Sequence, residues 1–132
     1  MKILVFGLPG SGKTTFSKNL LKYKNNIDHY EADKVREAFN DWDFTKDGRL
    51  RQAKRMDSLA KLSELNNRHS LLDFINPFED QRKNYDLKIF INTIDKSKYE
   101  DTNIIFEKPN NYDYEIINFN YDNVIKEIIN GL

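Results

Sequence analysis

The strongest chemical signal in the chain is a glycine-rich segment that ends in a lysine and two threonines. Residues 7–15 read Gly-Leu-Pro-Gly-Ser-Gly-Lys-Thr-Thr and match the pattern G-x-x-x-x-G-K-S/T. Glycines at this spacing let backbone N–H groups converge on phosphate oxygens. The segment predicts a site for a nucleoside triphosphate. The residues expected to contact it are Gly7, Leu8, Pro9, Gly10, Ser11, Gly12, Lys13, Thr14 and Thr15.

Two side chains of this segment have separate predicted roles. Lys13 is the expected catalytic cation that reaches the β- and γ-phosphates, and the Thr14 hydroxyl is an expected Mg²⁺ ligand. The alternative is a glycine-rich turn that binds nothing. An apolar run at residues 3–6 precedes the loop and a helical pattern follows it, which is the context that a phosphate loop requires.

Two aspartates are candidates for the side of the site that faces a phosphoryl acceptor. Asp33 directly follows a predicted strand, so its carboxylate could face the phosphate loop and orient an attacking hydroxyl. Its alternative role is a helix cap or a pair with Arg36. Asp73 interrupts an apolar strand, where a carboxylate is costly unless a cation lies nearby. That placement favours a metal ligand, with bonding to backbone amides as the alternative.

Arginines offer partners for an anionic acceptor, because a guanidinium binds phosphate or sulfate in bidentate fashion. Most surface arginines, however, are simply solvated. The candidates are Arg36, Arg49, Arg51, Arg55 and Arg82. Phe44 could stack on a nucleobase or anchor its loop. His29 and His69 lack metal-ligand spacing and are expected to be structural.

The elements that position these residues alternate along the chain. Strands are predicted at residues 3–6, 27–31, 70–75, 87–94 and 114–119, and helices from 13 and at 33–39, 49–66, 78–84 and 124–129. Residues 95–112 look irregular. Alternation of this kind predicts an α/β protein with the P-loop NTPase fold, in one domain over residues 1–132. A mostly parallel five-stranded sheet should carry helices on both faces.

Composition narrows the set of partners. Lysine plus arginine and aspartate plus glutamate each number 21, so no net charge favours nucleic acid or an anionic membrane. The chain has no cysteine and no apolar run long enough to span a bilayer. We expect a cytoplasmic protein that binds neither nucleic acid nor membrane.

The residues also resemble those of a known family, the adenylylsulfate kinases. Residues 7–15 resemble that family's phosphate loop, and Glu31–Arg36 resembles its Asp-Gly-Asp-Asn-Val-Arg segment. Asp43-Phe44-Thr45, with Arg49 and Gln52, resembles positions around the adenylylsulfate. Residues 74–78 resemble Phe-Ile-Ser-Pro-Tyr, with Asn76 in place of the serine.

The resemblance implies transfer of a phosphoryl group from ATP to the 3′-hydroxyl of adenylylsulfate. It places Asp33 beside the acceptor hydroxyl and magnesium. Asp33 thereby joins Thr14 and Asp73 as an expected metal ligand. The implied acceptor-binding residues are Asp33, Arg36, Phe44, Arg49, Gln52 and Asn76. A homodimer is compatible with the family.

One departure from the family affects the site. The family carries a lid with an Arg-Asp-Pro-Lys-Gly-Leu-Tyr motif, which this chain lacks between residues 95 and 103, and the two sequences rejoin at Phe106–Pro109. Compact proteins of this pattern resemble some encoded by bacteriophages. Loss of a lid leaves two alternatives open: a kinase for another hydroxyl acceptor (a nucleotide, a polynucleotide end or a small metabolite), or a nucleotide-binding protein without kinase activity.

Overall fold

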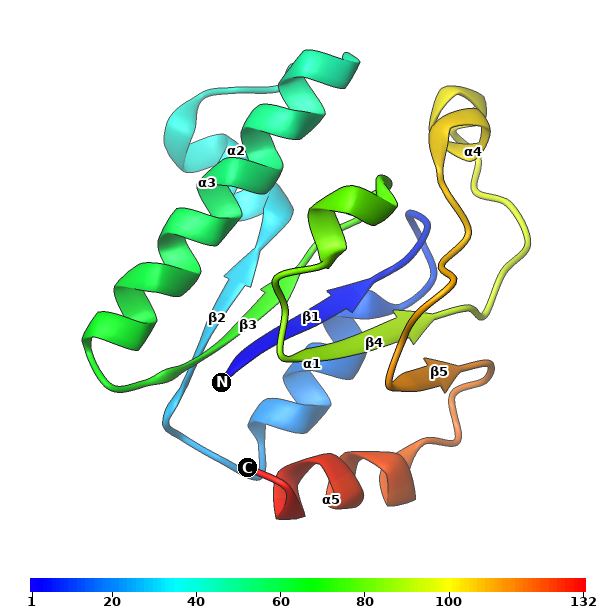
Figure 1. Cartoon of the computed structure of the whole chain (residues 1–132). Coiled ribbons are helices and arrows are strands. Elements are labelled where there is room, and N and C mark those ends of the chain that lie inside the picture. Colours follow the sequence, from blue (N-terminus) through cyan, green and yellow to red (C-terminus); the bar gives the residue numbers. More distant parts are fainter.

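A single five-stranded sheet forms the centre of the molecule, as a computed structural model of residues 1–132 shows (Figure 1). The strands are β1 (Lys2–Phe6), β2 (Ile27–Glu31), β3 (His69–Asp73), β4 (Leu87–Ile91) and β5 (Tyr114–Ile116). They lie in the order β2-β3-β1-β4-β5, and all four pairings are parallel. The predicted sheet is confirmed, and it is wholly rather than mostly parallel.

Helices cover both faces of this sheet. They are α1 (Lys13–Leu21), α2 (Ala32–Phe39), α3 (Lys46–Leu65), α4 (Glu100–Ile105) and α5 (Asp122–Asn130), with a 3₁₀ helix, η1 (Glu79–Arg82). Successive residues of β1 point to opposite faces. Ile3 and Val5 join a core with residues of α1 and α5, whereas Leu4 and Phe6 join a core with residues of α2 and α3. The central strand is therefore fully buried, as its continuous apolar run predicted.

Several helix starts differ from prediction, and those of α2 and α3 bear on the site. Helix α3 begins at Lys46 instead of 49, because Thr45 caps it by accepting a bond from the Gly48 N–H at 3.2 Å. Helix α2 begins at Ala32 with Glu31 in the cap position, so Asp33 lies in the first turn and is not the cap. The Asp33 carboxylate is consequently free of a capping bond.

The region predicted to be irregular, residues 95–112, contains the short helix α4. Its six residues are too few to show a helical period in the sequence. The strands β3, β4 and β5 end at 73, 91 and 116, before the predicted ends at 75, 94 and 119. No helix has the length and apolar character needed to cross a bilayer.

Candidate active site

The phosphate loop lies where β1 ends and α1 begins, at the carboxyl edge of the sheet. Gly7, Gly10 and Gly12 all have positive φ values, of 155°, 80° and 99°. A Cβ at Gly7 would collide with the carbonyl oxygen of Ile91 in β4, so that position requires glycine. The loop is also closed by a bond from the Ser11 N–H to the Leu8 carbonyl, at 3.2 Å.

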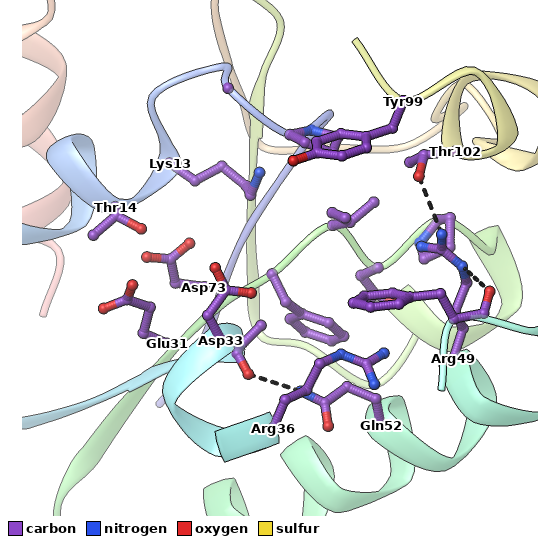
Figure 2. Close-up of a pocket in the computed structure, with 18 of the residues that line it drawn as sticks. Lys13, Thr14, Glu31, Asp33, Arg36, Arg49, Gln52, Asp73, Tyr99 and Thr102 are labelled. Carbon is purple, nitrogen blue, oxygen red and sulfur yellow. Dashed lines mark hydrogen bonds between the residues drawn. The ribbon is translucent and has the colours of Figure 1, made fainter. Parts of the chain in front are cut away.

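Lys13 projects from the first turn of α1 toward a group of carboxylates (Figure 2). Its ammonium donates to the Leu8 carbonyl at 2.9 Å. Burial lowers the pKa of Lys13 to about 8, while Asp73 and Asp33 act in the opposite direction and favour the charged form. A desolvated ammonium of this kind is ready to bind phosphate oxygens, which would restore its lost solvation.

Three carboxylates from the ends of β2 and β3 face Lys13 and Thr14 (Figure 2). Glu31 and Asp73 are register partners on the two strands, and Asp33 follows in α2. Asp33 and Asp73 were predicted from the sequence, whereas Glu31 was not, although Glu31 stands at the first carboxylate of the motif. The structure shows no ion pair between Asp33 and Arg36, so the pairing alternative for Asp33 is not observed.

Asp73 is almost completely buried, and its partner is His29. The His29 Nε2 lies 3.2 Å from Asp73 Oδ2. No backbone amide donates to the Asp73 carboxylate, so the alternative of bonding to backbone amides is not observed. His29, predicted to be structural, contacts this candidate site residue.

The donor set near Thr14 suits a hard divalent cation, because it consists of a hydroxyl and carboxylate oxygens. No group of three or more acidic, histidine or cysteine side chains is arranged to hold a metal ion unaided. Magnesium sites of phosphoryl-transfer proteins are completed by phosphate oxygens and waters, so these residues fit a metal that arrives with its nucleotide.

Two buried arginines and an aromatic ring form the other half of the site. Arg36 donates to the carbonyls of Asp41 and Asp43, at 2.9 and 3.2 Å. Its guanidinium lies 4.4 Å from the Phe44 ring centroid, and that of Arg49 lies 5.4 Å from it. Burial lowers the pKa of both arginines, which nevertheless stay cationic. This half can bind an anionic or planar group.

Arg49 is held from two sides. Its Nε donates to the Phe44 carbonyl at 2.9 Å, and its Nη2 donates to Thr102 Oγ1 at 3.1 Å. Thr102 belongs to α4, so a helix that the sequence did not reveal contacts a predicted acceptor residue (Figure 2).

Gln52 and Asn76 also line this half, with different hydrogen-bonding states. Gln52 donates to the Ala32 carbonyl and accepts from Arg55, so both ends of its amide are occupied. Asn76 has a left-handed backbone with φ 45°, and its Oδ1 is buried without a partner. Asn76 is thus the better placed of the two to accept a bond from a ligand.

The remaining candidate arginines lie outside the site. Arg51 and Arg55 pair with Asp41. Arg82 is 1% exposed and donates to the backbone carbonyls of Asn76 and Glu107, both at 2.8 Å. These arginines stabilise the structure around the site and do not face it.

A single cavity of about 870 Å³ joins the two halves. It contains parts of the phosphate loop, the carboxylates, and the Arg36 and Arg49 side chains. It also exposes residues that sequence reasoning missed: Glu31, Trp42, Lys98, Tyr99, Asp101 and Thr102. The last four flank or lie in α4, and no periodic pattern marks them in the sequence.

The fold and this loop define the class: the chain has the fold of the P-loop kinases. The hexameric APS kinase from Thiobacillus denitrificans superposes with a TM-score of 0.75 at 19% identity, over 97% of this chain and 27% of that one. The Mycobacterium tuberculosis APS kinase in complex with AMPPNP and APS superposes with a TM-score of 0.75 at 17% sequence identity, over 98% of this chain and 95% of that one. Shikimate kinase from Aquifex aeolicus superposes with a TM-score of 0.65 at 18% sequence identity, over 99% of this chain and 95% of that one.

The sequence match goes further than the fold. The family model described as Adenylylsulphate kinase matches residues 1–100, from β1 to the start of α4. The chain therefore belongs to the adenylylsulphate kinase family, as its motifs predicted. The match ends where α4 begins, so the last part of the cavity wall is outside it.

Proposed function

We propose that this protein transfers the γ-phosphoryl group of ATP to the 3′-hydroxyl of adenylylsulfate. The observation that carries the proposal is the continuous cavity, which places a phosphate loop at one end and two buried arginines at the other. The hydroxyl oxygen attacks the γ-phosphorus, the bond from that phosphorus to the bridging oxygen breaks, and ADP leaves.

The phosphate-loop half supplies the charge stabilisation for this reaction. Lys13 binds the β- and γ-phosphate oxygens, and backbone N–H groups of residues 7–15 surround them. Thr14, Asp33 and Asp73 would hold Mg²⁺, which neutralises charge on the phosphates when it is bound. Asp33 accepts the proton of the attacking hydroxyl.

The other half supplies acceptor binding. Arg36 and Arg49 carry the positive charge expected for a phosphosulfate, and the Phe44 ring lies against both guanidinium groups. Asn76 Oδ1 accepts a bond from the acceptor, since it has no partner within the protein. Gln52 positions its neighbours through its own two bonds.

A kinase for another hydroxyl acceptor is the second candidate. It is favoured by Asn76, which replaces the family serine with an unpaired amide oxygen, and by the missing lid motif. The formal net charge of the chain is zero, so a small acceptor is preferred to a polynucleotide end. A nucleotide-binding protein that transfers nothing is the remaining candidate.

The test is ADP release from Mg-ATP with and without adenylylsulfate. Lys13→Ala and Asp33→Asn should each abolish acceptor-dependent release. Lys18→Ala is the matched control, because Lys18 is exposed on the same helix as Lys13. Release that does not depend on adenylylsulfate would refute this acceptor, and a panel of other hydroxyl compounds would then test the second candidate.

A further inference from the structure

The segment between β4 and β5 forms a wall of the cavity. Residues 98, 99, 101 and 102 line it, next to the phosphate loop and Arg49. Tyr99 extends from the start of α4 above Lys13, and Thr102 points to Arg49 (Figure 2). The segment therefore contacts the acceptor half through Arg49 and lines the same cavity as the phosphate loop.

A closed set of hydrogen bonds fixes the segment. The backbone N–H and the hydroxyl of Ser97 both donate to Asn103 Oδ1, at 2.8 and 2.7 Å. Asn103 Nδ2 returns a bond to the Ser97 carbonyl at 2.8 Å. These bonds join the two ends of the segment, so Lys98 and Tyr99 are presented to the cavity by a rigid turn.

A second anchor holds the segment against the acceptor half. Thr102 is 3% exposed and accepts a bond from Arg49 Nη2. Asp101 adds an ion pair with the same nitrogen at 3.8 Å. Arg49 belongs to α3, so these two contacts fix α4 against α3 at the acceptor half of the cavity.

The charges around the cavity single out Lys98. Four cations line the cavity: Lys13, Arg36, Arg49 and Lys98. The first three already donate hydrogen bonds to protein oxygens. Lys98 makes no hydrogen bond or ion pair, and its ammonium lies 5.4 Å from the Tyr99 ring centroid. It is the one cation of the cavity wall whose binding capacity is entirely available to a ligand.

The phosphate-loop half needs such a cation. Glu31, Asp33 and Asp73 face a single lysine there, and a bound triphosphate adds further negative charge. Charge on the transferred phosphoryl group must be neutralised for the reaction to proceed.

We propose that Lys98 is the second cation of the site, that it binds the terminal phosphoryl group of the nucleotide, and that the Tyr99 ring covers that group against water. The role in transfer rests on the proposed kinase function. The binding part requires only that the phosphate loop holds a nucleoside triphosphate.

Calorimetric titration with two nucleotides tests the binding part. Mg-AMPPNP carries a terminal phosphate and Mg-ADP does not. Lys98→Gln should weaken AMPPNP binding roughly tenfold and change ADP binding less than about twofold, as expected for one lost charged hydrogen bond. The control is Lys96→Gln, because Lys96 is also exposed but does not line the cavity.

Tyr99→Ala tests whether the Tyr99 ring excludes water from the phosphoryl group. Tyr99→Ala should raise the ratio of acceptor-independent ATP hydrolysis to phosphoryl transfer about threefold or more, because water then reaches that group. Thermal unfolding of each variant checks that its fold is intact. Two results for Lys98→Gln would overturn the inference even if the wild type is an active kinase. One is AMPPNP affinity equal to that of wild type, and the other is an equal loss of affinity for AMPPNP and ADP. Wild type that binds AMPPNP and transfers nothing to adenylylsulfate refutes the proposed function, while the Lys98 comparison still decides the inference.

Discussion

Gly12→Ala tests the backbone conformation at the N-cap of α1, where the phosphate loop meets the helix. Gly12 has φ 99° and ψ 22°, where an L side chain costs about 1–2 kcal/mol. An added Cβ would lie 2.9 Å from Cε1 of Phe119, so that ring must move. Because Phe119 is 67% exposed, it can rotate at a cost of about 0.5–1 kcal/mol. Alanine also restricts the unfolded chain, which returns roughly 0.4–1 kcal/mol. The expected net loss of unfolding free energy is about 1–2 kcal/mol.

Urea denaturation of a double-mutant cycle separates these contributions. In a Phe119→Ala background the cost of Gly12→Ala should fall by about 0.5–1 kcal/mol, because the clash is gone and the backbone strain stays. Gly10→Ala is the matched control: its φ is 80°, and a Cβ there meets nothing within 4 Å. Its cost should be the same with and without Phe119. Equal costs of Gly12→Ala in the two backgrounds would refute the reasoning.

Three further predictions concern charged groups at or behind the site. Since burial lowers the pKa of Lys13 to about 8, its charge destabilises the ligand-free protein below pH 8, and this penalty disappears as the pH rises from 8 to 10.5. At pH 7 the Lys13→Met variant should therefore have a free energy of unfolding about 1–3 kcal/mol higher than wild type, as measured by urea denaturation. This difference should vanish near pH 10.5. Arg82→Met leaves the buried Asn76 carbonyl, the part-buried Glu107 carbonyl and the Glu79 carboxylate without their donor. It should lower the free energy of unfolding in urea by about 3–5 kcal/mol, against less than about 1 kcal/mol for the exposed Lys83→Met. His29→Phe removes the partner of Asp73 and should lower kcat/KM roughly tenfold, whereas His29→Gln keeps a donor and should restore much of it; equal losses would exclude a hydrogen-bonding role.

The sequence predicted the parts of the fold that depend on local pattern. The phosphate loop has a fixed spacing of glycines and ends in Lys13, so its position between β1 and α1 follows directly. Apolar runs indicated the five strands, although three of them end early. The start of α3 was missed because Thr45 acts as cap through a bond to Gly48, and several residues of that polar segment were equally able to begin a helix.

The wall formed by α4 could not be predicted, because contacts distant in sequence determine it. Six residues show no helical period, and the segment is fixed by the Ser97–Asn103 bonds and by the bond from Arg49 to Thr102. The latter joins residues 53 positions apart. In the sequence, residues 95–103 form a polar stretch without the lid motif of the family, and this indicates only that the lid is missing.

The arginines illustrate the same limit for the site. Five of them looked equivalent in the sequence, since each could bind an anion. The structure separates them by their partners: Arg82 holds backbone carbonyls behind the site, while Arg36 and Arg49 line the cavity. Lys98 had no feature that distinguished it from other lysines in the sequence. Lys98 becomes a candidate ligand-binding residue only because the other three cations of the cavity already donate hydrogen bonds to protein oxygens. Comparing AMPPNP and ADP binding by Lys98→Gln therefore tests directly whether an unpaired charge in a cavity identifies a functional residue.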